Sequence, residues 1–91
     1  MLPIVWRPEA RADLAAIIRY VAGRNPDAAQ ALLDMIEAAV APLSRHPLLY
    51  RAGRVVGTRE MVVHPNYIVV YRVAAGEVEV VSVLHARRQY P

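Results

Sequence analysis

The order of apolar and polar positions divides the chain into a helical first half and a strand-rich second half. Apolar residues recur every three or four positions over residues 10–21 and again over 29–43, which is the period of an amphipathic helix. Runs of β-branched residues at 67–73 and 78–84 instead indicate strands. We therefore expect two helices in the first half and a sheet built mainly from the second half.

Turn-forming and capping residues mark where the predicted helices begin and end. Pro8 suits the first turn of the first helix, and Gly23 suits its C-terminal end. Asn25 and Pro26 supply an N-cap and a first-turn proline for the second helix. Because the connection between the helices is so short, they must fold back as an antiparallel hairpin. Prolines near its end predict that the second helix stops or kinks over residues 41–45.

The remaining apolar segments predict four strands. A short apolar run at residues 2–6 predicts a first strand before the helices. The two β-branched runs are joined by a short connection containing Gly76, which can take a positive φ, and this is typical of a hairpin. The apolar groups at 55–56 and 61–63 predict one further strand before the turn at Pro65.

The order strand, helix, helix, strand, strand, strand predicts an α+β fold, βααβββ, with the helical hairpin packed on one face of a mostly antiparallel four-stranded sheet. We expect residues 1–91 to form a single domain. The strands are apolar on both faces, since Ile68 and Val70 alternate with Val69. We therefore expect a partner to cover apolar surface that the helices leave open. Alternatively, the helices and the linker at 45–53 cover it themselves.

Charge is unevenly distributed along the chain. Residues 1–40 carry four Arg against five acidic residues, a net charge of −1, whereas residues 41–91 carry seven Arg against three acidic residues, a net charge of +4. A basic half suits contact with nucleic acid or with an acidic protein segment.

Several classes of protein are disfavoured by composition and motifs. The chain contains no Cys, which excludes disulfides, thiolate zinc sites and Cys nucleophiles. It has no Gly-rich phosphate loop, no metal-binding spacing and no serine nucleophile elbow, so we expect no cofactor and no metal. No window approaches the roughly 20 apolar residues that span a bilayer, and the N-terminus does not resemble a signal peptide. We therefore expect a cytoplasmic protein with no membrane partner.

Candidate functional residues gather in the basic half. His85 ends the last predicted strand next to two arginines, although a packed strand-end histidine would give the same pattern. Arg59 and Glu60 are adjacent on a strand and point to opposite faces, so we expect one of them to be solvated. Arg72 lies on an apolar face and needs a carboxylate partner or a route to solvent. The predicted binding residues for a target or partner are Arg59, Arg72, His85, Arg87 and Arg88.

Four segments in order resemble the toxins of the bacterial RelE/ParE superfamily. They are the helical segment 7–20, the segment 57–63, the strand 67–73 and the ending 83–90. The resemblance covers nearly the whole chain. It implies the βααβββ fold, a role in plasmid stabilisation, and a cognate antitoxin whose C-terminal segment wraps the toxin. It also implies growth arrest when the antitoxin is degraded.

The superfamily contains two activities, and the resemblance favours one of them. RelE-like toxins are ribosome-dependent endoribonucleases that cut mRNA, whereas ParE-like toxins inhibit DNA gyrase. In RelE-like toxins a basic residue follows the tyrosine that opens the third strand, but here Tyr67 is followed by Ile68. The ending at 84–88 resembles ParE, so we expect a gyrase inhibitor rather than an enzyme. Under the ribonuclease alternative, the catalytic residues would be Arg59, His85, Arg87 and Tyr90. A third hypothesis is a nucleic-acid-binding module without catalysis.

Overall fold

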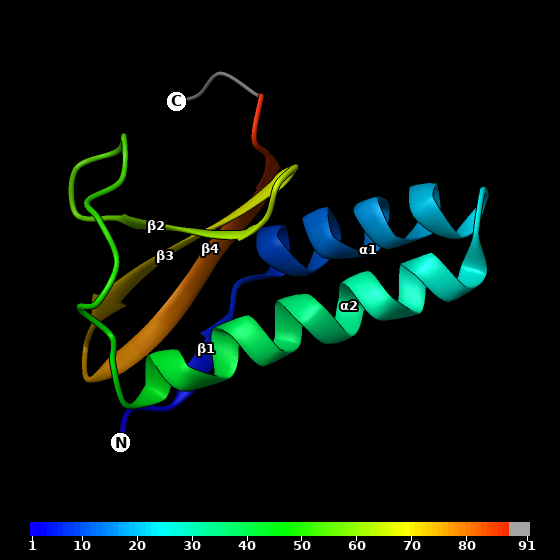
Figure 1. Ribbon diagram of the computed structural model, residues 1–91. Helices are drawn as coiled ribbons and strands as arrows, with labels where there is room; N and C mark the ends of the chain where they lie inside the picture. The colour runs from blue at the N-terminus through cyan, green and yellow to red at the C-terminus, as the bar shows by residue number, and fades with distance from the viewer. Residues whose placement is uncertain (88–91) are drawn as a thin grey trace.

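The computed structural model describes residues 1–87 and has the predicted order of elements. A helical hairpin lies beside a twisted four-stranded sheet (Figure 1). The α+β class and the order βααβββ are therefore confirmed, with a short 3-10 turn added after the second helix. The elements are β1 (Ile4–Trp6), α1 (Pro8–Ala22), α2 (Pro26–Val40), η1 (Ala41–Ser44), β2 (Arg59–His64), β3 (Tyr67–Ala74) and β4 (Glu77–His85).

The sheet is mixed but mostly antiparallel, as predicted. Its strand order is β1-β4-β3-β2, with β1 parallel to β4 and the other neighbours antiparallel. The first strand is shorter than the predicted 2–6. Leu2 donates its N–H to the Ser44 carbonyl at 3.0 Å instead of joining the ladder, and Pro3 has no N–H to donate.

The ends of the helices follow the predicted signals. Asn25 caps α2, because its side-chain oxygen accepts the Ala28 N–H at 3.1 Å. The second helix ends at Val40, where the chain tightens into η1 around Pro42, so its predicted termination is confirmed. No helix within residues 1–87 has the length and apolar character needed to cross a membrane.

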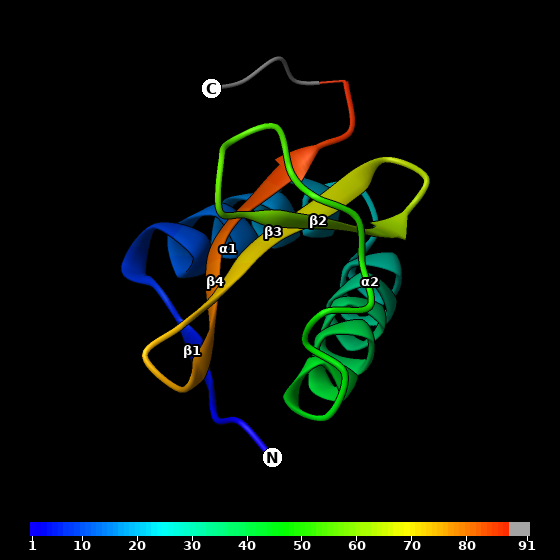
Figure 2. The ribbon, with the colours of Figure 1, turned by 90° about the vertical axis from the view of Figure 1, so that its left-hand side faces the viewer.

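Both faces of the sheet bury apolar side chains. This agrees with the apolar residues on both sides of the strands and, for the second face, with the alternative that the chain covers it without a partner. The face toward the helices forms the main core, which includes Ile36 from α2 and Val69, Tyr71 and Val80 from the strands. The opposite face, called the outer face below, buries a smaller cluster of Ile68, Val70 and Leu84. Figure 2 shows the linker before β2 running on the side of the sheet away from α1.

The linker between η1 and β2 is held to the main core by Tyr71. The Tyr71 hydroxyl donates a hydrogen bond to the Pro47 carbonyl at 2.8 Å, and burial raises the pKa of this tyrosine. The predicted strand segment at 55–56 is wrong, because these residues lie in an exposed loop and β2 starts only at Arg59. A positive φ of 86° at Gly57 turns the chain there and interrupts the extended backbone.

Candidate functional site

Three aromatic side chains lie side by side at one end of the sheet. His64 on β2 pairs with Tyr67 on β3, and Tyr67 pairs with His85 on β4. Because directly paired residues share a face, their rings form a row, called the aromatic row below. The Tyr67 ring centroid lies 5.5 Å from that of His64 and 5.6 Å from that of His85, which it meets edge-on.

Both histidines of the aromatic row are oriented by the backbone. The Nδ1 atom of His64 accepts the Asn66 N–H at 3.0 Å, and the Nδ1 atom of His85 accepts the Arg87 N–H at 3.2 Å. A ring nitrogen that accepts a hydrogen bond carries no proton, so each neutral ring keeps its proton on Nε2. The two histidines therefore offer Nε2–H donors to a ligand, and their Nδ1 atoms are already occupied.

Open hollows border the aromatic row on two sides. One of about 320 Å³ is lined by residues of α1 and α2 together with His64 and Tyr67. Another of about 550 Å³ lies between α1 and the row and is lined in part by Tyr20, Tyr67 and His85. The guanidinium of Arg24 stands 4.9 Å from the centre of the Tyr20 ring, a cation–π contact at the edge of this region. Tyr20, which helps to line the second hollow, therefore carries a cation beside its ring.

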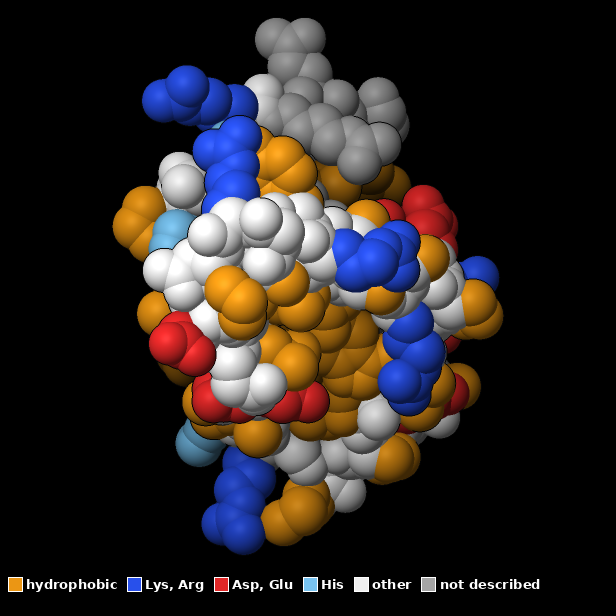
Figure 3. Space-filling view, turned by 90° about the vertical axis from the view of Figure 1, so that its right-hand side faces the viewer, with side chains coloured by type: hydrophobic (Ala, Val, Ile, Leu, Met, Phe, Trp, Pro, Cys, Tyr) orange, Lys and Arg blue, Asp and Glu red, His pale blue; other side chains and the backbone are white. Residues whose placement is uncertain are grey.

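A separate groove of about 280 Å³ lies between α1 and α2. It exists because the sheet covers only part of α1, in which Ala10 is the one buried residue. Figure 3 shows the helical side of the molecule, where apolar side chains line a hollow between cations on one side and carboxylates on the other. The residues lining this helical groove are Trp6, Arg11, Leu14, Ala15, Ile18, Leu33 and Glu37.

Arg59 is engaged by the linker before β2. Its Nη1 atom donates to the Tyr50 carbonyl at 2.6 Å and to the Leu48 carbonyl at 3.3 Å, and its side chain is half-buried. Glu60 points to the outer face and is only 3% exposed. The expectation that one of these two side chains would be solvated is therefore wrong. The linker folds back over the strand and gives both of them partners.

Arg72 has both of the outcomes that the sequence left open, a carboxylate partner and a side chain that reaches solvent. Its Nε atom donates to Glu79 Oε1 at 2.7 Å, and Arg7 Nη1 donates to the same oxygen at 3.0 Å. Hydrogen bonds from Arg7 and then Arg72 lower the pKa of Glu79. This cluster joins the start of α1 to the β3–β4 hairpin, far along β3 from Tyr67.

The structure brings His85 and Arg87 together and places Arg59 and Arg72 elsewhere. Arg87 is exposed directly after the aromatic row, and Arg59 lies beside Tyr71, toward the opposite end of β3. Arg88 and Tyr90 lie outside the described residues. Within residues 1–87, no three His, Asp or Glu side chains gather in a way that could hold a metal ion.

Sequence reasoning missed the partnership of His64, Tyr67 and His85. From the sequence, His64 reads as a surface turn residue and Tyr67, which opens a predicted strand, reads as a core residue. The signal that could have found the row is the length of the turns. Short turns fix the cross-strand register, and the register sets these three positions opposite one another.

Two comparisons of sequence identify relatives over nearly the full chain. The family model for the ParE toxin of the type II toxin-antitoxin system, parDE, matches residues 4–90. The putative toxin Y4kP of Sinorhizobium fredii is 37% identical over 89 residues, covering 97% of this chain and 92% of the relative. Toxin RelE2 of Caulobacter vibrioides is 38% identical over 90 residues, covering 97% of this chain and 99% of the relative.

Solved structures of similar fold agree with the family match. The chromosomal ParDE toxin-antitoxin system from P. aeruginosa superposes with a TM-score of 0.84 at 24% identity, covering 93% of this chain and 96% of that one. The YoeB dimer from Staphylococcus aureus gives a TM-score of 0.64 at 16% identity, covering 98% of each chain. At these identities the likeness shows the fold. Together with the family match over residues 4–90, it places this chain in the ParE family of type II toxin–antitoxin toxins, within the RelE/ParE superfamily.

Proposed function

We propose that this toxin inhibits DNA gyrase in the cytoplasm, has no nuclease activity and is neutralised by a cognate antitoxin. The observation that carries the proposal is the position of Arg59, the cation that a ribonuclease would need on this strand. Its guanidinium is occupied by two linker carbonyls, at 2.6 and 3.3 Å. The match of the ParE family model over residues 4–90 supports the same target class.

Cleavage of RNA makes demands that the described side chains meet poorly. Attack of a 2′-hydroxyl on phosphate needs cations around a dianionic transition state, together with an acid or base in reach. Arg72 is bound to Glu79, and the position after Tyr67 holds the buried apolar Ile68. His85 and Arg87 are the pair that remains at the aromatic row, and the Nδ1 atom of His85 is already an acceptor.

A RelE-like ribonuclease is the second candidate, and two observations favour it. One relative, 38% identical, is named toxin RelE2. The aromatic row also offers Tyr67 as a stacking surface for a base, with Arg87 beside it for a phosphate. Under this alternative the toxin would act on mRNA at the ribosome.

One experiment separates the two targets. The purified chain is added to a DNA gyrase supercoiling assay and, in parallel, to a translation extract whose mRNA is mapped for new 5′ ends. We expect inhibition of gyrase and unchanged mRNA. Ribosome-dependent cuts that disappear in Arg59→Ala or His85→Ala would overturn the gyrase proposal. Salt-sensitive gel shifts without either effect would favour a non-catalytic nucleic-acid-binding module.

We propose the helical groove as the binding site of the antitoxin. Its floor is apolar, with Trp6, Leu14 and Ile18 among the lining residues, while Arg11 and Glu37 supply opposite charges. A C-terminal segment with an apolar stripe would fill this groove as an amphipathic helix fills a hydrophobic cleft. Ala15→Asp places a charge among the lining residues, so we expect it to weaken antitoxin binding measured by calorimetry while growth arrest persists.

A further inference from the structure

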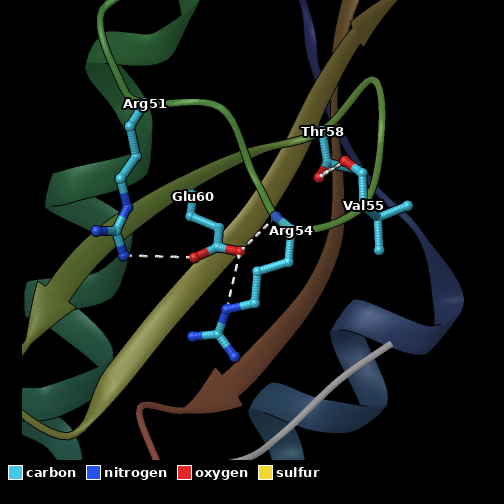
Figure 4. Close-up of polar contacts among 5 residues, drawn as sticks. All are labelled: Arg51, Arg54, Val55, Thr58 and Glu60. Atoms are coloured by element: carbon cyan, nitrogen blue, oxygen red, sulfur yellow. Dashed lines mark hydrogen bonds and ion pairs between the residues drawn. The ribbon is translucent and has the colours of Figure 1, made fainter.

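The loop at residues 51–58, called the knob loop below, is fixed on the outer face by a buried carboxylate. Glu60 is 3% exposed, and its Oε2 atom accepts the Arg54 N–H at 2.9 Å (Figure 4). The Arg54 guanidinium lies 3.5 Å from the same oxygen, and Arg51 Nη2 lies 3.4 Å from Oε1. Glu60 also donates its own N–H to the Arg51 carbonyl at 3.1 Å. The Glu60 side chain therefore ties the first half of the loop to β2.

Bonds within the knob loop fix the shape of its tip. Thr58 donates both its N–H and its hydroxyl to the Val55 carbonyl, at 3.1 and 2.6 Å, and its own carbonyl accepts the Gly53 N–H at 2.7 Å. A Cβ atom at Gly53 would collide with the Thr58 hydroxyl, so a larger residue there would displace the Thr58 side chain. Gly57 takes a φ of +86°, which favours glycine as well. The loop is thus a closed and bonded unit rather than a slack connection.

This fixed loop holds an apolar side chain out in water. Val56 is 98% exposed at the tip, so it adds almost nothing to the packing of the fold. Leu48 and Leu49, in the preceding linker, are 65% and 70% exposed. A single exposed valine is ordinary. Here, however, polar bonds fix the loop that carries Val56, and Leu48, Leu49 and Val55 are exposed as well, which suits a contact that the isolated chain does not make. Arg51 and Arg54, which precede the tip in the chain, pair with Glu60, and their side chains remain 65% and 40% exposed.

The shape of the tip selects the kind of partner. The hollows described above lie on the helical side and at the aromatic row, and they suit a segment that wraps the toxin. The knob loop protrudes instead, so its partner must supply a recess, as a folded protein does. The exposed side chains of Arg51 and Arg54 would match carboxylates around the rim of that recess. From these features we infer that the knob loop inserts Val56 into an acidic-rimmed apolar pocket of the protein that the toxin inhibits. This inference rests on the proposed function in requiring a protein target.

The test uses three variants of the full chain. Val56→Asp and Val56→Ser change the tip, and Ala15→Asp puts the same new charge in the helical groove. Both Val56 variants should keep the melting temperature and the antitoxin affinity of the wild type, while inhibition of the target falls at least about tenfold. Asp should have the larger effect, because it faces carboxylates. Ala15→Asp should retain target inhibition and lose antitoxin affinity.

Three results would overturn the inference. The first is that Val56→Asp inhibits the target as strongly as the wild type. The second is that either Val56 variant loses antitoxin affinity. The third is that a Val56 variant has a lower melting temperature, which would mean that Val56 packs within the fold. Gyrase supercoiling and viable counts after induction are both measured. If the wild type arrests growth without affecting gyrase, the gyrase proposal fails, and viable counts of the Val56 variants still decide the role of the knob loop.

Discussion

The two faces of the sheet are stabilised in different ways. Toward the helices, side chains such as Ile36, Tyr71 and Val80 are fully buried in one continuous apolar core. On the outer face, the buried apolar cluster within residues 1–87 consists of Ile68, Val70 and Leu84, and the nearby Glu60 holds the knob loop by polar bonds. The helical face is stabilised mainly by burial of apolar surface, and the outer face by hydrogen bonds and ion pairs.

The difference between the faces shows that apolar burial stabilises the fold as a whole, whereas hydrogen bonds position a single loop. Apolar burial has no preferred direction, so the core fixes the packing of whole helices and tolerates small shifts. Hydrogen bonds are directional, so the contacts of Glu60 and Thr58 define where one valine stands. Substitutions on the helical face should therefore act chiefly on stability, and those on the outer face chiefly on the geometry of the knob loop.

The largest predicted effect compares the same substitution on the two faces. Ile36→Ala should lower the free energy of unfolding by about 4 kcal/mol, because Ile36 is fully buried in the main core. Ile68→Ala should lower it by about 2 kcal/mol, because Ile68 belongs to a cluster of three with less around it. Urea denaturation followed by circular dichroism measures both. Equal losses, or a larger loss at Ile68, would show that the outer face carries as much of the core as the helical face.

A smaller effect is expected at the carboxylate that holds the knob loop. Glu60→Gln keeps the shape of the side chain but removes the charge that faces Arg51 and Arg54. We expect a loss of about 1–3 kcal/mol in the free energy of unfolding. Amide hydrogen exchange should become faster at Gly53 and Thr58, while exchange in α2 stays at the wild-type rate relative to global unfolding. Uniformly faster exchange throughout the chain would mean that Glu60 supports the whole fold rather than the loop.

The sequence predicted the helical face better than the outer face, because the helices and hairpins are specified by residues close together in the chain. Apolar spacing placed both helices, and Asn25 and the short turns placed the hairpins, since each depends on residues close in the chain. Val55 and Val56 look like strand residues by composition, but the turn at Gly57 leaves them in the knob loop. Propensity could not reveal that turn.

The candidate site was predicted only in part for the same reason. His85 and Arg87 are neighbours in the sequence and remain neighbours in the structure. Arg59 was predicted as a binding residue as well, but its guanidinium donates to the carbonyls of residues 48 and 50. Those contacts form only when the linker folds back over β2. A tertiary contact of this kind leaves no periodic trace in the sequence.

The smallest predicted effect concerns Glu79, whose ion pairs lie at the surface rather than on either buried face. Hydrogen bonds from Arg7 and Arg72 lower the pKa of Glu79 in the folded chain, so folding favours its charged form. That stabilisation is present above the unfolded carboxyl pKa and is lost as the pH falls through the folded pKa. The difference in melting temperature between wild type and Glu79→Gln should therefore shrink from about pH 7 to about pH 3, and also at high salt. A difference that stays constant with pH would show that Glu79 acts through packing rather than charge.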